Sequence, residues 1–100
     1  MSRLPYLITK KAVADLDEIW HHTVEKWSLR QADRYYSLIF DEIHYICEHP
    51  ASARPMDHIR AGYRASKVKS HLIFYRLVDE TIEIIRILHE RMNIDNRMID

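Results

Sequence analysis

Hydrophobic residues recur every three or four positions over two long stretches in the first half of the chain, which is the spacing of one face of an α-helix. Thr9 can cap the first helix. Ser28 and Gln31 form the capping box of a second helix, which begins near Leu29 and ends before Pro50. The apolar stripe of the first helix is Ala12, Val13, Leu16, Ile19, Trp20, Thr23 and Trp27. That of the second is Ala32, Tyr35, Tyr36, Ile39, Ile43 and Ile46. The short join between them predicts an antiparallel helical hairpin.

Runs of β-branched and aromatic residues predict strands on both sides of this hairpin. A short strand over Leu4–Ile8 comes before it. After a loop over Ala51–Ile59, three strands follow near Tyr63–Val68, His71–Leu77 and Thr81–His89. The turns between these three are too short for anything but antiparallel neighbours, and the last strand is apolar on both faces, which predicts an interior place in the sheet.

The order of elements predicts an α+β fold, with an N-terminal strand, a helical hairpin and then a three-stranded antiparallel meander. The hairpin is expected to cover one face of a mostly antiparallel four-stranded sheet. The side chains expected in or near the core are Leu16, Trp20, Ile39, Ile43, Phe74 and Ile87.

Composition narrows the class of protein. The chain is 47% hydrophobic and 30% charged, and residues 1–100 are enough for one domain. No stretch approaches the roughly 20 apolar residues that span a bilayer, and the first ten residues lack the apolar run of a signal peptide. The lone Cys47 excludes an internal disulfide. We therefore expect a cytoplasmic protein that makes no membrane contact.

Charge is balanced overall but uneven along the chain. Residues 54–76 hold six basic side chains and one acidic one, which is +5, whereas residues 1–50 hold six basic and eight acidic ones, which is −2. The basic stretch suits either a face for an anionic partner, whether nucleic acid or an acidic protein segment, or an ordinary solvated strand. The zero net charge argues against strong non-specific binding of nucleic acid.

A series of short motifs resembles the ParE branch of the RelE/ParE toxin family, in the order and spacing of that family. They cover nearly the whole chain and are Ala12, Asp15-Leu16, Ile19-Trp20, Trp27, Gln31-Ala32, Pro50, Arg60, Gly62-Tyr63-Arg64, Ser70-His71, Ile73-Phe74-Tyr75-Arg76 and Arg86-Ile87-Leu88-His89. Three positions depart from the family pattern. Ser28 and Lys69 stand where Gly is frequent, and Asn93 stands where Asp is common.

The resemblance implies a toxin of a type II toxin–antitoxin module that needs no cofactor. It implies inhibition of DNA gyrase by binding, neutralisation by a ParD-like antitoxin in a hetero-oligomer, and no sequence-specific contact with nucleic acid. RelE-like relatives with the same fold instead cleave mRNA on the ribosome, and fold alone does not decide between the two activities.

Two surfaces follow from these expectations. An acidic antitoxin segment would meet the basic stretch at Arg60, Arg64, Lys67 and Lys69. The target would meet the end of the chain at His89, Arg91, Arg97 and Met98. The tail beyond Leu88 turns polar yet keeps Ile94, Met98 and Ile99, which suits an exposed docking strip or, equally, a tail that packs back onto the domain. Deletion of Asp95–Asp100 is then expected to remove toxicity and leave the fold intact.

An RNA-cleaving site would need an acid, a base and a cation near the phosphate. The candidates are His71, Tyr75, Arg86 and His89, with Arg64 and Lys67 as further cations. Strand alternation puts His71 and Tyr75 on one face, but it puts Arg86 and His89 on opposite faces unless a bulge intervenes. Tyr75 is also typical of a packing residue and Arg86 of a structural ion pair. The pattern favours an inhibitor that has no catalytic residues.

The remaining histidines do not indicate a metal site. His21 and His22 are adjacent and diverge on a helix, while His44 and His49 are five apart instead of three or four. The chain also has no Cys-x-x-Cys pair.

Overall fold

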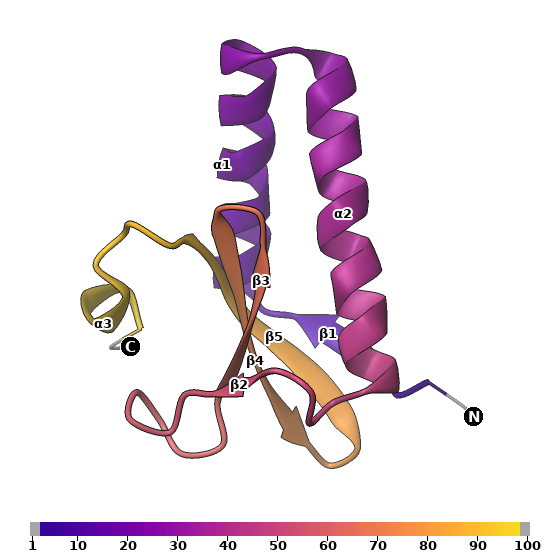
Figure 1. Cartoon of the computed structure of the whole chain (residues 1–100), viewed down its shortest axis with the longest axis vertical. Helices are drawn as coiled ribbons and strands as arrows, with labels where there is room; N and C mark the ends of the chain where they lie inside the picture. Colours follow the sequence, from indigo (N-terminus) through magenta and orange to yellow (C-terminus); the bar gives the residue numbers. More distant parts are fainter. Residues whose placement is uncertain (1–2, 99–100) are drawn as a thin grey trace.

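A helical hairpin lies on one face of a twisted five-stranded sheet in the computed structural model, which describes residues 3–98 (Figure 1). The elements are β1 (Tyr6–Ile8), α1 (Lys10–Lys26), α2 (Leu29–Glu48), β2 (Arg54–Pro55), β3 (Arg64–Val68), β4 (His71–Val78), β5 (Thr81–His89) and α3 (Ile94–Arg97). The strand order is β1-β5-β4-β3-β2. β1 runs parallel to β5, and the other neighbours are antiparallel. The expected α+β architecture is confirmed.

The sheet has one strand more than the sequence predicted. β2 is only two residues long and pairs with β3 at Arg54↔Ala65 and Pro55↔Arg64, inside the stretch expected to be a loop. So short a segment shows no alternation that could reveal it. The first strand is also shorter than expected, because the Leu4 N–H donates to the Cys47 carbonyl instead of to the sheet.

Both helix starts follow the capping chemistry read from the sequence. The Thr9 side chain accepts a hydrogen bond from the Ala12 N–H, and the Ser28 side chain accepts one from the Gln31 N–H. The half of the hairpin nearer its tip extends beyond the sheet (Figure 1). Trp27 follows the end of α1 at this tip and is 69% exposed. Val13, near the start of α1, is 46% exposed although it belongs to the predicted apolar stripe.

The sheet carries a hydrophobic cluster on each face, since neighbouring residues of β4 point in opposite directions. The larger cluster lies under the hairpin and contains Leu16, Ile39, Ile43, Ile73 and Ile87. The smaller one contains Tyr63, Ala65, Phe74, Leu88 and Met98. Of the six residues expected in or near the core, five are buried and Trp20 is partly buried.

The second half of β5 contains a β-bulge and is bonded by the side chains of Thr9 and Asp15. Phe74 pairs with Arg86 but Tyr75 pairs with Ile84, so Ile85 is the extra residue of β5. β1 pairs only with the first half of β5. Beyond it, Thr9 Oγ1 donates to the Ile85 carbonyl (2.9 Å) and Asp15 Oδ2 accepts from the Ile87 N–H (2.9 Å). Side chains thus replace the missing strand neighbour.

Candidate functional site

A groove of about 680 Å³ lies between α1 and the ends of β4 and β5, and we call it the histidine groove. Eight of the residues that line it belong to α1, between Asp15 and Glu25. Its lining residues are Asp15, Asp17, Glu18, Ile19, His21, His22, Thr23, Glu25, His71, Ile87, His89, Arg91 and Met92. Two of the predicted target-binding residues, His89 and Arg91, therefore border the same hollow as His71, a catalytic candidate only if the protein were a ribonuclease.

His71 and His89 form the inner part of this groove. Their ring centres are 5.2 Å apart, edge to face. Tyr35 Oη donates to the Val68 carbonyl (3.2 Å) and lies 2.6 Å from His71 Nδ1, which can donate to the phenol oxygen. Burial, and then the neighbouring His89 and His22, lower the pKa of His71 from 6.5 to about 4. His71 is therefore a neutral, hydrogen-bonded imidazole at pH 7.

The rim of the histidine groove is acidic on the α1 side. Asp17, Glu18 and Glu25 are exposed there, against one cation, Arg91. Carboxylates repel a phosphodiester, so this groove lacks the electrostatics that stabilise a phosphoryl transition state. It is better suited to a protein segment with apolar and basic side chains than to a nucleic-acid strand.

A second hollow of about 270 Å³ contains a group of basic residues, and we call it the cationic hollow. It is lined by Thr9, Lys10, Lys11, Arg60, Tyr63, Ile85, Arg86, Arg97 and Met98. Arg86 is held by two bonds to Asp15, Nε to Oδ2 at 2.8 Å and Nη2 to Oδ1 at 2.9 Å, and its Nη1 donates to the Arg97 carbonyl at 2.8 Å. The structural ion pair considered for Arg86 is thus observed.

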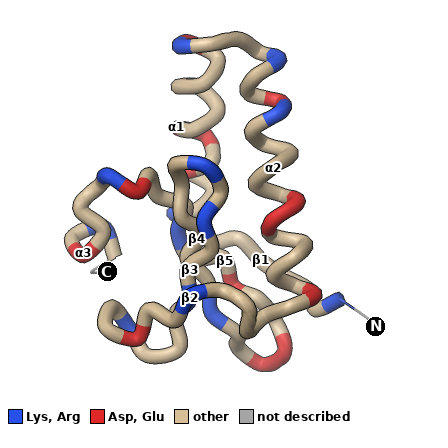
Figure 2. The backbone as a smooth tube through the Cα atoms, viewed as in Figure 1, with Lys and Arg blue, Asp and Glu red and all other residues tan. Residues whose placement is uncertain are grey.

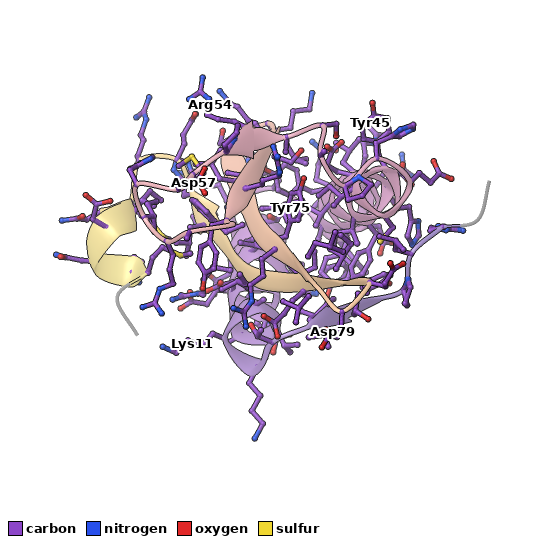
Figure 3. All side chains as sticks on the ribbon, turned by 90° about the horizontal axis from the view of Figure 1, so that it is seen from below. Lys11, Tyr45, Arg54, Asp57, Tyr75 and Asp79 are labelled. Carbon is purple, nitrogen blue, oxygen red and sulfur yellow. The ribbon has the colours of Figure 1, made fainter. Side chains whose placement is uncertain are left out.

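The four candidate catalytic residues do not converge. Tyr75 is 1% exposed under the hairpin, where its hydroxyl donates to the Pro50 carbonyl, and burial raises its pKa (Figure 3). Arg86 lines the cationic hollow, whereas His71 and His89 line the histidine groove. The bulge at Ile85 therefore does not bring Arg86 beside His89.

The predicted antitoxin-binding residues do not form one continuous face. Arg64 lies on the hairpin side of β3, and its Nη1 donates to the Ala53 carbonyl (2.7 Å). Lys67 points the other way, because the two are three residues apart in a strand, and it pairs with Glu90 (3.0 Å). Lys69 lies in the adjoining turn, where Figure 2 shows basic residues together, and Arg60 lies at the cationic hollow. Of the two interpretations of the basic stretch, a single continuous basic face is therefore not observed.

The tail packs back onto the sheet instead of forming an exposed strip. Met98 is 7% exposed and belongs to the smaller cluster, against which Ile94 also packs. Arg91 and Arg97 are exposed, while Ile99 lies outside the described residues. Asn93, which departs from the family pattern, caps α3 by accepting from the Asn96 N–H (3.3 Å).

Within residues 3–98, no three His, Cys, Asp or Glu side chains are placed to hold a metal ion. In the same range, no helix is both long and apolar enough to cross a membrane.

The sequence did not indicate several residues that line these two hollows or, like Tyr35, hold a residue that does. Asp15 is 7% exposed and stands at stripe spacing between Ala12 and Ile19, a signal that could have identified it as the carboxylate that Arg86 needs. Tyr35 was assigned only to a packing stripe. No sequence signal marks Lys10 and Lys11, because only the folded chain brings them beside Arg97.

The sequence of this chain matches a known protein family and several characterised relatives. Residues 6–94 match the family described as the ParE toxin of the type II toxin–antitoxin system, parDE. Toxin ParE1 of Caulobacter vibrioides is 43% identical over 89 residues, which cover 89% of this chain and 92% of that protein. Toxin ParE1 of Mycobacterium tuberculosis is 38% identical over 94 residues, which cover 93% and 96%.

Solved structures agree on the fold. A chain of the chromosomal ParDE system from P. aeruginosa superposes with a TM-score of 0.76 at 23% identity, over 87% of this chain and 96% of that one. A chain of the RelBE2 toxin–antitoxin complex from Mycobacterium tuberculosis gives 0.60 at 20% identity, over 88% and 99%. Given the match over residues 6–94 and the identity to two ParE1 toxins, the chain belongs to the ParE toxin family of type II toxin–antitoxin systems.

Proposed function

We propose that this toxin arrests growth by binding DNA gyrase, and that it has no catalytic residues of its own. The observation that supports this is the separation of the four candidate catalytic side chains, with Tyr75 in the core and Arg86 tied to Asp15. A protein without a converging acid, base and cation acts through contacts. Such a role is cytoplasmic, because gyrase acts on the bacterial chromosome.

The surface proposed for the target is formed by His89, Arg91 and Arg97. His89 and Arg91 border the histidine groove, and Arg97 lies at the cationic hollow on the other side of the chain end. Met98 supports this surface from beneath, because it is buried against the sheet. Exposed cations next to a concave, partly apolar surface suit a protein partner.

A ParD-like antitoxin is the proposed neutralising partner, in a hetero-oligomer. The likeness to a chain from a ParDE system supports the pairing. Lys67 near the end of β3 and Lys69 in the turn that follows, together with Arg60, are the proposed contacts for an acidic segment that folds on binding. Arg64 is a weaker contact candidate than the sequence indicated, since it holds the Ala53 carbonyl.

Two activity assays run side by side test the proposal. Purified toxin is added to a gyrase supercoiling reaction and, separately, to translating ribosomes with a defined mRNA. The expected result is loss of supercoiling with intact mRNA, and weaker inhibition by a variant carrying Arg91→Glu and Arg97→Glu. Cut mRNA with normal supercoiling would instead establish the RelE-like activity and overturn the proposal.

A further inference from the structure

The histidine groove is complementary to a segment of this same chain, the tip of the helical hairpin at residues 26–30. We propose that the hairpin tip of one copy docks in the histidine groove of a second copy, so that each tip of a symmetric dimer fills the partner's groove. This inference goes beyond the proposed inhibition of gyrase and does not depend on it. It rests on the exposed apolar side chains of the tip and on the opposite charges of the two surfaces.

The hairpin tip exposes two large apolar side chains between two cations. Trp27 is 69% exposed and Leu29 is 61% exposed. Lys26 and Arg30 flank them and are exposed as well, and Figure 2 shows basic positions on both sides of the join between α1 and α2. A single exposed apolar residue is ordinary, but two large ones together at a projecting end are typical of a contact surface. The tip therefore has the composition of a segment that binds an apolar groove with an acidic rim.

The histidine groove offers that opposite chemistry. Ile19, Ile87 and Met92 form the apolar part of its lining. Its rim on the α1 side carries three exposed acids, which are Asp17, Glu18 and Glu25. A groove of about 680 Å³ is large enough to hold several side chains of a partner segment.

The charges of the two surfaces are equal and opposite when the histidines are neutral. The three rim acids and the single cation Arg91 leave the groove with a charge of −2, since Arg86 neutralises Asp15. Lys26 and Arg30 give the tip +2. Within residues 3–98, no ion pair occupies the rim acids or the two tip cations, so all of them are available to a partner. Such complementarity orients two surfaces as they meet.

The shape of the molecule allows both contacts of a dimer at once. The half of the hairpin nearer the tip projects beyond the sheet, and the groove lies between α1 and the ends of β4 and β5 (Figure 1). The α1 part of the groove runs from Asp15 to Glu25, about 15 Å at the helical rise per residue, and the tip begins at the next residue. His22 is midway between Trp27 and Asp17. Two antiparallel α1 helices with a two-fold axis near His22 therefore bring each tip to the other groove.

A second copy fits the groove better than the antitoxin does. The contacts proposed for the antitoxin, at Arg60, Lys67 and Lys69, attract an acidic segment, whereas the acidic rim of the groove repels one. A docked tip also covers His89 and Arg91, which border the groove. The dimer therefore withholds two residues of the surface proposed for the target.

Sedimentation equilibrium of the purified toxin, over a range of concentrations, measures this self-association. A tip variant carries Lys26→Glu and Arg30→Glu, and a rim variant carries Asp17→Lys and Glu18→Lys. All four side chains are exposed. Trp27→Ala, a single change at an exposed side chain, tests the apolar part of the contact and should leave the urea midpoint nearly unchanged.

The matched control carries Arg3→Glu and Arg54→Glu. It reverses two exposed charges that lie outside both the tip and the groove. Its self-association should stay within about twofold of that of the unmodified toxin, because isolated exposed charges away from a contact act weakly.

We expect the unmodified toxin to dimerise with a micromolar dissociation constant. The tip variant and the rim variant should each associate at least about tenfold more weakly, because like charges then face each other at both contacts. Trp27→Ala should also weaken the dimer about tenfold, since a buried aromatic anchor contributes that much at an interface. A mixture of the tip and rim variants should restore the dimer, because each contact of that heterodimer pairs opposite charges again.

Three results would overturn the inference. The first is a control variant that weakens self-association as much as the tip variant does, which indicates a general effect of charge. The second is a mixture of tip and rim variants that stays monomeric, which separates the tip from the groove. The third is a toxin that is monomeric at every concentration. In that case, weaker antitoxin binding by the rim variant would assign the groove to the antitoxin.

Discussion

At the scale of single residues, Asp15 connects most of the features described. Its carboxylate accepts two bonds from the Arg86 guanidinium and one from the Ile87 N–H, with a side chain 8% exposed. A buried carboxylate is tolerated when its oxygens are bonded in this way, and removal of one partner leaves the other charge uncompensated.

We expect Asp15→Ala to lower the free energy of unfolding by about 3–5 kcal/mol. The substitution leaves the buried Arg86 guanidinium and the Ile87 N–H without their carboxylate partner. Urea unfolding measures it. The matched control is Glu83→Ala, which breaks the more exposed Arg76–Glu83 pair (2.6 Å) and should cost about 1 kcal/mol or less. Equal losses in the two variants would contradict the structural role given to Asp15.

His71 makes stability depend on pH. Its pKa is about 4 in the folded protein against 6.5 when unfolded, so the unfolded chain takes up the proton first as the pH falls. His71 therefore destabilises the fold progressively from pH 6.5 down to pH 4 and adds no further change below. The groups facing it are His89, His22, Asp15 and Glu90.

The expected loss from this one group is about 1–2 kcal/mol between pH 7 and pH 4, less than the full shift would give because solvent screens an open groove. His71→Asn, which keeps a polar atom near Tyr35, should reduce that slope in urea titrations. His58→Asn, in an exposed loop, should leave the slope unchanged. A slope that survives in the His71 variant contradicts the assignment.

At the scale of elements, two of the strand turns hold residues other than Gly in the left-handed backbone conformation. The β4–β5 turn places Asp79 at φ 49° and Glu80 at φ 61°, and the β3–β4 turn places Lys69 at φ 54°. Residues with a Cβ atom disfavour this left-handed region, so all three residues are strained there.

Replacing Asp79-Glu80 by Asn-Gly should raise the free energy of unfolding by up to about 1 kcal/mol, because Asn-Gly is the preferred pair for a two-residue hairpin with positive φ at both positions. This gain in stability is smaller than the strain energy that is removed at Glu80. Gly also raises the conformational entropy of the unfolded chain, which opposes folding. Chemical denaturation measures it, and a lower urea midpoint would show that the two carboxylates stabilise the turn in another way.

At the scale of the whole molecule, the chain end completes the smaller cluster. Met98 covers Phe74 and Leu88, and the Arg97 carbonyl accepts from Arg86. Deletion of Asp95–Asp100 therefore removes core as well as surface, which corrects the expectation that the fold would be left intact.

We expect that deletion to cost about 2–5 kcal/mol of stability, comparable to the loss of a buried large side chain. The pair Arg91→Glu and Arg97→Glu should change stability by about 0.5 kcal/mol or less while still lowering toxicity, because both side chains are exposed. Urea unfolding and growth assays together distinguish the cases. Full toxicity of the double variant would remove these two residues from the target surface.

Association with the antitoxin is expected to depend on charge at the β3–β4 turn. Lys67→Glu with Lys69→Glu should slow association and flatten its salt dependence, since exposed charges act mainly on the encounter rate. The hairpin-tip pair Lys26→Glu and Arg30→Glu, equal in charge change, should have little effect. Association rates that do not differ between low and high salt would falsify the electrostatic part of the partner proposal.

The helical hairpin and the main strands of the meander could be predicted because they depend on neighbours in sequence. The caps Thr9 and Ser28 and the spacing of Leu16, Ile39 and Ile43 specify helices through contacts within one or two turns. The motifs around Arg86 and His89 likewise indicated the family. The sequence by itself therefore determined the helical hairpin, the longer strands, their order and the family, but not β2 or α3.

Only the tertiary structure decided which functional side chains meet. Asp15 and Arg86 are 71 positions apart, and the five cations of the hollow come from four separate segments. Their encounter depends on the bulge at Ile85, on the parallel pairing of β1 with β5 and on the tail folding over the sheet. None of these leaves a local periodic signal, because each depends on contacts between residues far apart in the chain. For the same reason the sequence left open whether the tail packs back and whether the basic stretch forms one face. In the structure Met98 is buried, and Arg64 and Lys67 point to opposite sides of β3.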